Sequence, residues 1–261
     1  MPIIFFRDFI CAVFLGLIVL MAGRPAFSQE TPGSATTVES RTHVLASLLN
    51  EEWEYELRTS PEFATSIGDP RYNDRFSDES PEFHQSNVEQ KRQFLGRFEA
   101  IDPSGFSEQD KLSRQLMVRQ LQQDIEGARF KNWEMPVNQM SGPHLELPDL
   151  ITLTPFNTVK DYQDYISRLR QIPHVLDQVT ANMRQGMANH LMPARFLLEK
   201  VAPEVDDIAK QPGENSPFAK PLKQFPSGIP DADQKLLRDA ILSAITDQVI
   251  PAYRKFGEFV R

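Results

Sequence analysis

Hydrophobic residues recur at spacings of three and four positions along most of the chain, which is typical of one buried face of an α-helix. The pattern predicts long helices that begin near Thr42, Pro81, Ser107, Thr158, Pro193 and Asp231. Proline is expected to kink or restart three of them, at Pro173, Pro203 and Pro251. The sequence therefore predicts a mainly α fold, built as an array of several helices.

Residues 57–80 hold the densest group of helix-starting and helix-ending signals. Ser60-Pro61 is typical of a helix start, with a capping hydroxyl followed by proline in the first turn, and Gly68 is typical of a helix end. Asp69-Pro70 then breaks the helix, and Ser80-Pro81 repeats the start signal. We expect a short helix and an ordered polar loop, locked by ion pairs among Arg71, Asp74, Arg75 and Asp78.

Two segments lack the helical period. Residues 131–156 contain prolines at spacings that leave no room for a helix, yet they remain apolar, so we expect a long buried insert with one short strand pair near 137–140. A loop of this length in a compact domain is usually functional. Residues 211–228 form a second irregular stretch, rich in proline and glycine.

The first residues have the features of an export signal. Arg7 precedes an uncharged apolar run from Phe9 to Gly23, and Ala26-Phe27-Ser28 provides small residues for cleavage before Gln29. This assigns residues 1–28 to a signal peptide, 29–41 to a flexible leader and 42–261 to a helical domain. The protein is then periplasmic or extracellular, whereas an uncleaved segment would act as an N-terminal membrane anchor.

Composition narrows the classes of function. The net charge is −8, which argues against a nucleic-acid partner because such a partner requires a basic surface. The single cysteine, Cys11, lies inside the signal segment and at the start of its apolar run, where lipidation does not occur. After cleavage the protein has no disulfide, no cysteine nucleophile and no thiolate metal ligand.

Common catalytic motifs are absent from the sequence. The paired histidines of a zinc-peptidase helix, the Gly-x-Ser-x-Gly elbow and the glycine-rich phosphate loop do not occur. The chain therefore has no assigned catalytic residue and no assigned metal ligand. Glu52 and Glu56 form a carboxylate pair four positions apart, which we interpret as part of a solvated helix face.

The best polar group lies in the long insert, where His144 and Glu146 follow Asn138. An imidazole beside a carboxylate can orient a substrate or act as a base, so these three residues are candidates for substrate binding. The alternative is that His144 is a buried histidine that braces the loop backbone. His84, by contrast, is expected on the surface.

Four sequence blocks, taken in order, resemble the bacterial family called Domain of Unknown Function 885. They are residues 61–78, Asn138-x-x-x-Gly142-Pro143-His144, the segment from Asp161-Tyr162 to Pro173, and Arg184-x-Gly186 followed by Met192-Pro193. The resemblance extends from about Leu45 to the end of the chain. It implies a helical fold similar to zinc-dependent peptidases, whose metal motif is a His-Glu-x-x-Pro-Gly-His run in the C-terminal half.

This motif does not occur in the chain, so the resemblance implies the N-terminal lobe of a larger peptidase-like fold, inactive alone. No cofactor is expected here, and zinc and a peptide substrate are expected only in a full-length relative. The alternative is an exported helical binding module without enzymatic activity. The apolar face from Leu237 to Val260 continues to the last residues, so we also expect an exposed C-terminal helix that supports self-association.

Overall fold

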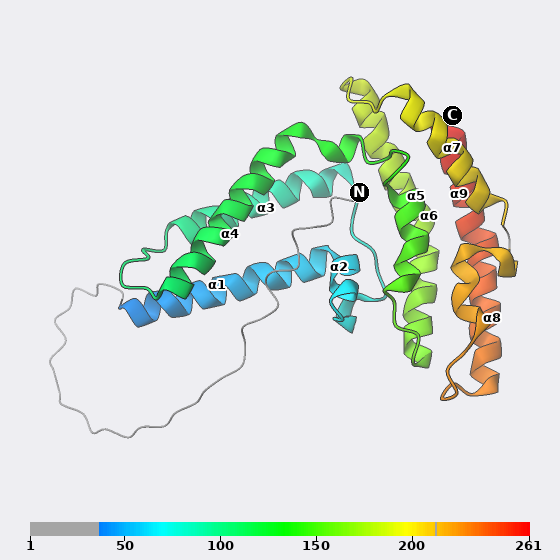
Figure 1. Cartoon of the computed structure of the whole chain (residues 1–261), viewed down its shortest axis with the longest axis horizontal. Helices are drawn as coiled ribbons and strands as arrows, with labels where there is room; N and C mark the ends of the chain where they lie inside the picture. Colours follow the sequence, from blue (N-terminus) through cyan, green and yellow to red (C-terminus); the bar gives the residue numbers. More distant parts are fainter. Residues whose placement is uncertain (1–36, 212) are drawn as a thin grey trace. The chain divides into compact units, whose positions relative to one another are not determined.

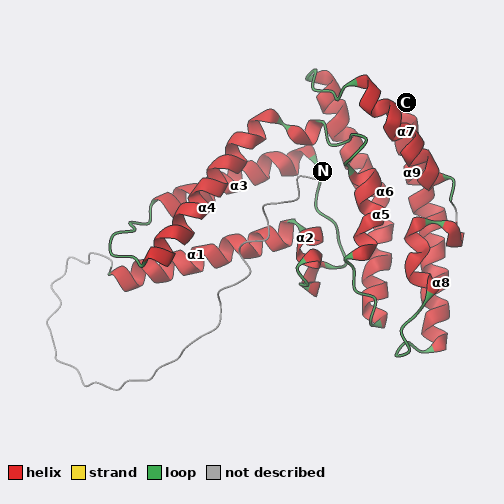
Figure 2. Ribbon diagram, viewed as in Figure 1, coloured by secondary structure: helices red, strands yellow, loops and turns green. Residues whose placement is uncertain are grey.

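A computed structural model describes residues 37–211 and 213–261, and these residues fold mainly as helices (Figures 1 and 2). The α-helices are α1 (Val38–Thr59), α2 (Pro61–Ser66), α3 (Pro81–Glu99), α4 (Glu108–Gly127), α5 (Pro143–Asp149), α6 (Val159–Ala188), α7 (Arg195–Ala209), α8 (Asp231–Ala244) and α9 (Ile250–Val260). The described part contains no strand, so the predicted mainly α class is confirmed. The predicted signal peptide and most of the leader lie outside the described residues.

Side-chain caps fix where several helices begin. The hydroxyl of Ser80 accepts a hydrogen bond from the backbone N–H of Phe83, and Thr158 and Asp161 form a reciprocal capping box at the start of α6. Thr37 caps α1 in the same way, so this helix starts before the predicted Thr42. None of the described helices combines the length and the apolar run needed to cross a membrane.

Two interior prolines do not interrupt their helices, although the sequence predicted a restart at Pro173 and a kink or break at Pro203. The helix α6 runs without interruption through Pro173, and α7 runs through Pro203. Proline removes one backbone donor and crowds the preceding turn. Around Pro173 the cost is offset by burial, because Ile172, Val175 and Leu176 are all inside the core. Tertiary packing thus decides the length of α6.

The long insert also differs from the prediction that it contains no helix. The insert contains the helix α5, with Pro143 in its first turn. It also contains two single-turn 3-10 helices, η3 (Asn132–Glu134) and η4 (Leu150–Thr152). The predicted strand pair is reduced to one bridge between Asn138 and Ser141. The second irregular stretch likewise holds two 3-10 helices, η5 (Gly213–Asn215) and η6 (Pro217–Lys223).

The C-terminal apolar face is covered, which corrects the expectation of an exposed C-terminal helix. Between α8 and α9 lies a π-helical segment, η7 (Ile245–Val249), and the face continues through all three elements. Ile241, Tyr253 and Phe256 are at most 1% exposed because α6 and α7 pack over them. Self-association through this face would therefore require the core to open.

Candidate functional site

The segment that contains the candidate residues begins with a tight turn. The backbone groups of Asn138 and Ser141 are hydrogen-bonded to each other across it. The Asn138 side chain also donates to the Ser141 hydroxyl at 2.8 Å and accepts from the Met140 N–H at 2.8 Å. Asn138 thus shapes the turn with its own side chain, and it remains half-buried at the rim of the segment.

Gly142 links this turn to α5 in a way that only glycine allows. Its φ of 134° lies in a region that side chains disfavour, and an added Cβ would come within 3.0 Å of His144 Nδ1 and 3.1 Å of the Pro136 carbonyl oxygen. The Gly142 N–H donates to the Glu146 carboxylate at 3.0 Å. The exposed Glu146 therefore ties the turn to the first turn of α5.

His144 is completely buried where α5 meets α7 and α9. Its Nε2 lies 3.2 Å from the Glu204 carboxylate on α7, and its carbonyl oxygen accepts a hydrogen bond of 3.3 Å from the Tyr253 hydroxyl on α9. Its other ring nitrogen, Nδ1, is buried and has no hydrogen-bond partner among the residues that the structure describes. His144 thus joins three helices that are far apart in sequence.

Electrostatics favour the neutral form of this imidazole. Burial lowers the pKa of His144, and the hydrogen bond and the charge of Glu204 only partly oppose that effect. A neutral ring that faces a carboxylate carries its proton on Nε2, so Nε2–H donates to Glu204 and Nδ1 keeps its lone pair. The same arrangement orients general bases and metal-bound histidines elsewhere, but here Nδ1 faces Gly142 inside the protein.

Sequence reasoning found His144 and missed its partners. Glu204 lies 60 residues further along the chain and Tyr253 lies 109 residues further, so no local spacing connects them to His144. Glu204 occurs in an acidic run of α7 and gives no separate signal. His84 was also misjudged as a surface residue, because its ring stacks on Trp133 with centroids 5.1 Å apart.

A second polar centre, also missed, surrounds Arg168 on α6. This arginine is 1% exposed, and its Nε donates to the Arg75 carbonyl oxygen at 2.9 Å. Its Nη2 donates to the Thr65 hydroxyl at 2.7 Å and to the carbonyl oxygens of Pro61 and Tyr72, each at 3.3 Å. One buried guanidinium therefore holds α2 and the loop after it against α6.

Other polar side chains of α6 bind the same loop through its backbone. Gln171 donates to the Asp74 carbonyl oxygen at 2.7 Å, and Asn182 donates to the Glu79 carbonyl oxygen at 2.6 Å. The predicted ion-pair lock forms only in part: Arg75 pairs with Asp74, but Arg71 pairs with Asp69 and Glu54. Asp78 instead accepts hydrogen bonds from Ser80 and Gln178.

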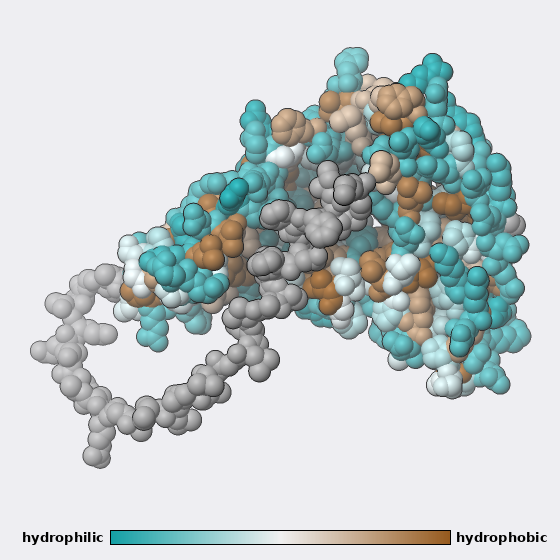
Figure 3. Space-filling view, in the orientation of Figure 1, coloured by the Kyte–Doolittle hydropathy of each residue, from teal (hydrophilic) through white to brown (hydrophobic). Residues whose placement is uncertain are grey.

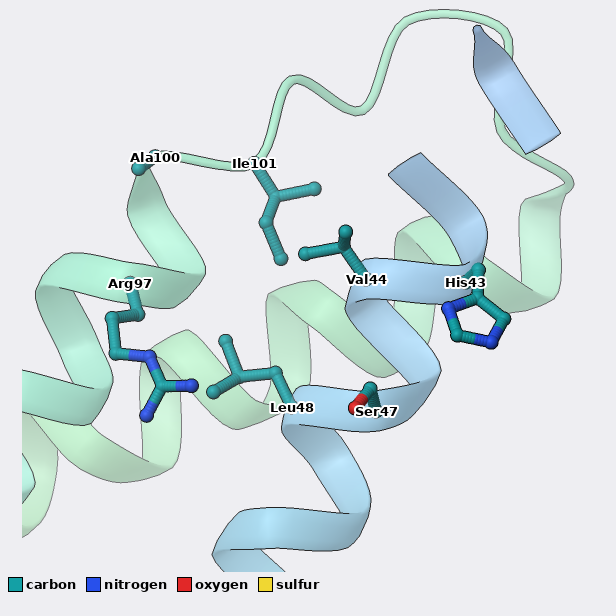
Figure 4. A pocket seen from close by; sticks show the side chains of 7 residues that line it. All are labelled: His43, Val44, Ser47, Leu48, Arg97, Ala100 and Ile101. Carbon is teal, nitrogen blue, oxygen red and sulfur yellow. The ribbon is translucent and has the colours of Figure 1, made fainter. Parts of the chain in front are cut away.

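Two of the hollows on the surface of the described residues are lined by none of the candidate residues. The first, of about 450 Å³, lies between α1 and the end of α3, where Val44, Leu48 and Ile101 point toward one another beside Arg97 (Figure 4). The second, of about 290 Å³, lies between α6 and α9 and has a charged rim that includes Asp177 and Lys255. The first is lined by both apolar and polar side chains, and the lining of the second includes an ion pair of 2.6 Å between Lys255 and Asp177.

The donor set of the described residues does not fit a zinc site. A catalytic zinc takes three protein ligands, whereas no group of three histidine, cysteine, aspartate or glutamate side chains converges within these residues. His144 and Glu204 bind each other, and a pair supplies too few ligands for a catalytic zinc. No reaction step is therefore assigned to a metal held by the described residues.

These features define an α-helical protein in which a buried histidine, next to a glycine-led turn, is paired with a half-buried glutamate. A family model described as "Bacterial protein of unknown function (DUF885)" matches residues 61–261. The chain belongs to this family. The match begins at Pro61, the residue whose carbonyl oxygen Arg168 binds.

A solved structure shows the same fold in a longer protein. It is described as the crystal structure of the putative lipoprotein from Colwellia psychrerythraea, with 17% sequence identity and a TM-score of 0.74. The match covers 85% of this chain and 41% of that one, so the chain spans less than half the length of the structure it resembles. No curated protein matches the sequence.

Proposed function

We propose that this chain is the non-catalytic helical portion of an exported zinc-peptidase-like hydrolase and that it binds peptide substrate beside a metal centre formed by residues outside the chain. The observation that carries the proposal is the match of 85% of this chain to 41% of a longer chain with the same fold. Zinc in the complete enzyme would activate water for hydrolysis. Residues 37–261 would provide binding and orientation.

Within this portion the turn before α5 has the right construction for substrate contact. Asn138 and Glu146 lie at the rim, half-buried and exposed respectively, and their side chains carry amide and carboxylate groups that suit a peptide backbone. His144 lies beneath them and is held by Glu204 and Tyr253. We assign contact to the two rim residues and support to His144.

Export is supported by two separate observations. The apolar run after Arg7 and the small residues before Gln29 are typical of a cleaved signal. The protein with the same fold is described as a "putative lipoprotein", and lipoproteins are an exported class. N-terminal sequencing of the protein recovered from outside the cytoplasm tests this, and a chain that still begins at Met1 would indicate an anchor.

The proposed function is tested with the purified full chain in three assays. Calorimetric titration with zinc should show no stoichiometric site, and a mixed peptide substrate should remain uncleaved with or without a chelator. A labelled mixed-sequence peptide should still bind, and Glu146→Gln should weaken its affinity roughly threefold to tenfold through loss of one polar contact. Chelator-sensitive cleavage, or absence of any peptide binding, would overturn the proposal.

A further inference from the structure

The connection between α6 and α7 is held rigidly from inside. A Cβ at Gly186 would come within 2.3 Å of the Glu134 carbonyl oxygen and 2.7 Å of the Leu191 carbonyl oxygen, so the backbones of two loops lie directly against this glycine. The buried Glu134 carboxylate accepts two hydrogen bonds from the Asn189 amide, at 2.7 and 2.9 Å. His190 completes the turn with a left-handed φ of 57°.

The outer surface of this rigid connection is apolar. Met187, Met192 and Phe196 are 50%, 52% and 63% exposed, although they lie within ten residues of one another in sequence. Figure 3 shows hydrophobic residues gathered at the end of the molecule where α6 leads into α7. Isolated exposed apolar side chains are ordinary, but a group on a rigid support is typical of an interaction surface.

The charges on this connection have the opposite sign to those of the whole chain. The chain carries −8, whereas residues 187–200 contain two permanent cations, Arg195 and Lys200, and one carboxylate. Arg195 and Lys200 are both exposed, and Arg195 is paired with that carboxylate, Glu199, at 2.9 Å on the surface. Such exposed pairs are weak, so both cations can be shared with a ligand.

We propose that Met187, Met192, Phe196, Arg195 and Lys200, named here the turn surface, bind peptide segments that combine apolar side chains with carboxylates. This inference rests on the proposed function and assigns it a substrate class. Methionine side chains are flexible and polarisable, so they adapt to apolar partners of different shape. The neighbouring cations select for acidic residues by charge complementarity.

A peptide fits the turn surface better than a lipid bilayer does. A membrane-surface helix buries a long apolar face, and its opposite face is strongly basic. The turn surface has only three apolar side chains, and the acidic Glu199 lies next to it in sequence. An extended peptide needs only a few apolar contacts and one or two charge pairs.

The test measures binding of three fluorescein-labelled decapeptides to the full chain by fluorescence anisotropy. One peptide combines leucine and glutamate, the second has lysine in place of glutamate, and the third has serine in place of leucine. The first should bind most tightly. Phe196→Asp should weaken its binding about tenfold or more, and the double variant Arg195→Glu, Lys200→Glu should shift preference to the lysine peptide.

Leu236→Asp provides the matched control, because Leu236 is 67% exposed on α8 and lies outside the turn surface. It should leave peptide binding unchanged, and circular dichroism should show that all variants remain folded. The inference would be overturned if the three peptides bound equally well, or if Leu236→Asp weakened peptide binding as much as Phe196→Asp does. It would also be overturned if the chain bound only to phosphatidylglycerol vesicles. Concentration-dependent dimerisation abolished by Phe196→Asp, without peptide binding, would assign the surface to a second copy instead.

The two proposals fail in different ways. Glu146→Gln tests the turn before α5, whereas Phe196→Asp tests the turn surface. If zinc-dependent cleavage by the chain alone overturned the proposed function, the ranking of the three peptides would still report whether the turn surface selects acidic apolar segments. If that ranking failed while Glu146→Gln still weakened binding of the mixed-sequence peptide, the proposed function would stand.

Discussion

Helices α1, α3 and α4 enclose a cluster of seven buried hydrophobic side chains, whereas the elements from Val137 to the C-terminus share a cluster of twenty-seven. The smaller cluster is supplemented by polar contacts between its helices, such as the Lys91–Asp124 pair at 2.5 Å and the Arg97–Glu51 pair at 2.6 Å. Pairs of this kind contribute little when they are exposed to solvent. The helices α1, α3 and α4 should therefore open at a lower free energy than α6 to α9.

The two regions also differ in the ionisable group whose pKa is shifted. In the small region, desolvation and the nearby Glu56 raise the pKa of Glu52 to about 7, and Glu52 is half-buried, not fully solvated as the sequence predicted. In the large region, burial lowers the pKa of His144. The regions should therefore respond to acidification with opposite signs.

The largest expected effect comes from removing matched aromatic side chains from the two clusters. Phe218→Ala in the large cluster should destabilise the whole protein by about 3–5 kcal/mol. Phe98→Ala in the small cluster should instead release α1, α3 and α4 while the protection of α6 persists. Hydrogen exchange measured by mass spectrometry separates these outcomes, and simultaneous loss of protection in both variants would contradict the comparison.

The next effect concerns the polar contacts that hold α2 and the loop after it against α6. Arg168→Met should cost about 2–3 kcal/mol, because three carbonyl oxygens and one hydroxyl lose a donor in a buried place. Urea denaturation gives the free energy of unfolding. The exposed Arg170 on the same helix is the control, and Arg170→Met should change stability by less than about 0.5 kcal/mol.

A smaller effect is expected from Glu52. Its folded pKa of about 7 exceeds the ordinary 4.5, so the folded state binds the proton more tightly and stability falls as pH rises from about 4.5 to 7. Glu52→Gln should remove this loss and stabilise α1, α3 and α4 at pH 8 by about 1–2 kcal/mol, allowing for partial solvent screening. Exchange rates at pH 8 measure it. The exposed Glu82→Gln should have no such effect.

The smallest effect is expected from His144. Its folded pKa lies below the ordinary 6.5, so its contribution to stability is complete above 6.5 and is lost as pH falls through the folded pKa. His144→Gln should flatten this acid-side loss in α5 and α7, as followed by thermal unfolding between pH 7 and 4. The exposed His174→Gln serves as control. If His144→Gln lost thermal stability between pH 7 and 4 as steeply as the unchanged protein does, the expected acid response of the large region would be contradicted.

The sequence predicted the structural features that depend on residues close together in the chain, and it failed for features that depend on distant residues. Ser80-Pro81, Thr158 with Asp161, and Gly68 act within a few residues, and the helix ends they predict are present. The continuous helix across Pro173 depends on packing by distant residues, so the local rule failed there. The candidate His144 was found by its type, but its partners required the fold.

The π-helical segment η7 has a consequence for the phase of the C-terminal stripe. Leu237, Ile241, Ile245, Val249 and Tyr253 recur at intervals of four. In an ideal α-helix each such step turns about 40° past a full rotation, so the stripe would wind away from the core. The wider turn of η7, closed by the Ile250 N–H on the Ile245 carbonyl oxygen, compensates for part of that rotation. The orientation of the stripe therefore depends more on the length of η7 than on its side chains. Removal of one residue would rotate Tyr253 and Phe256 about 100° toward solvent. A substitution at the exposed Asp247 would instead leave the stripe facing the core.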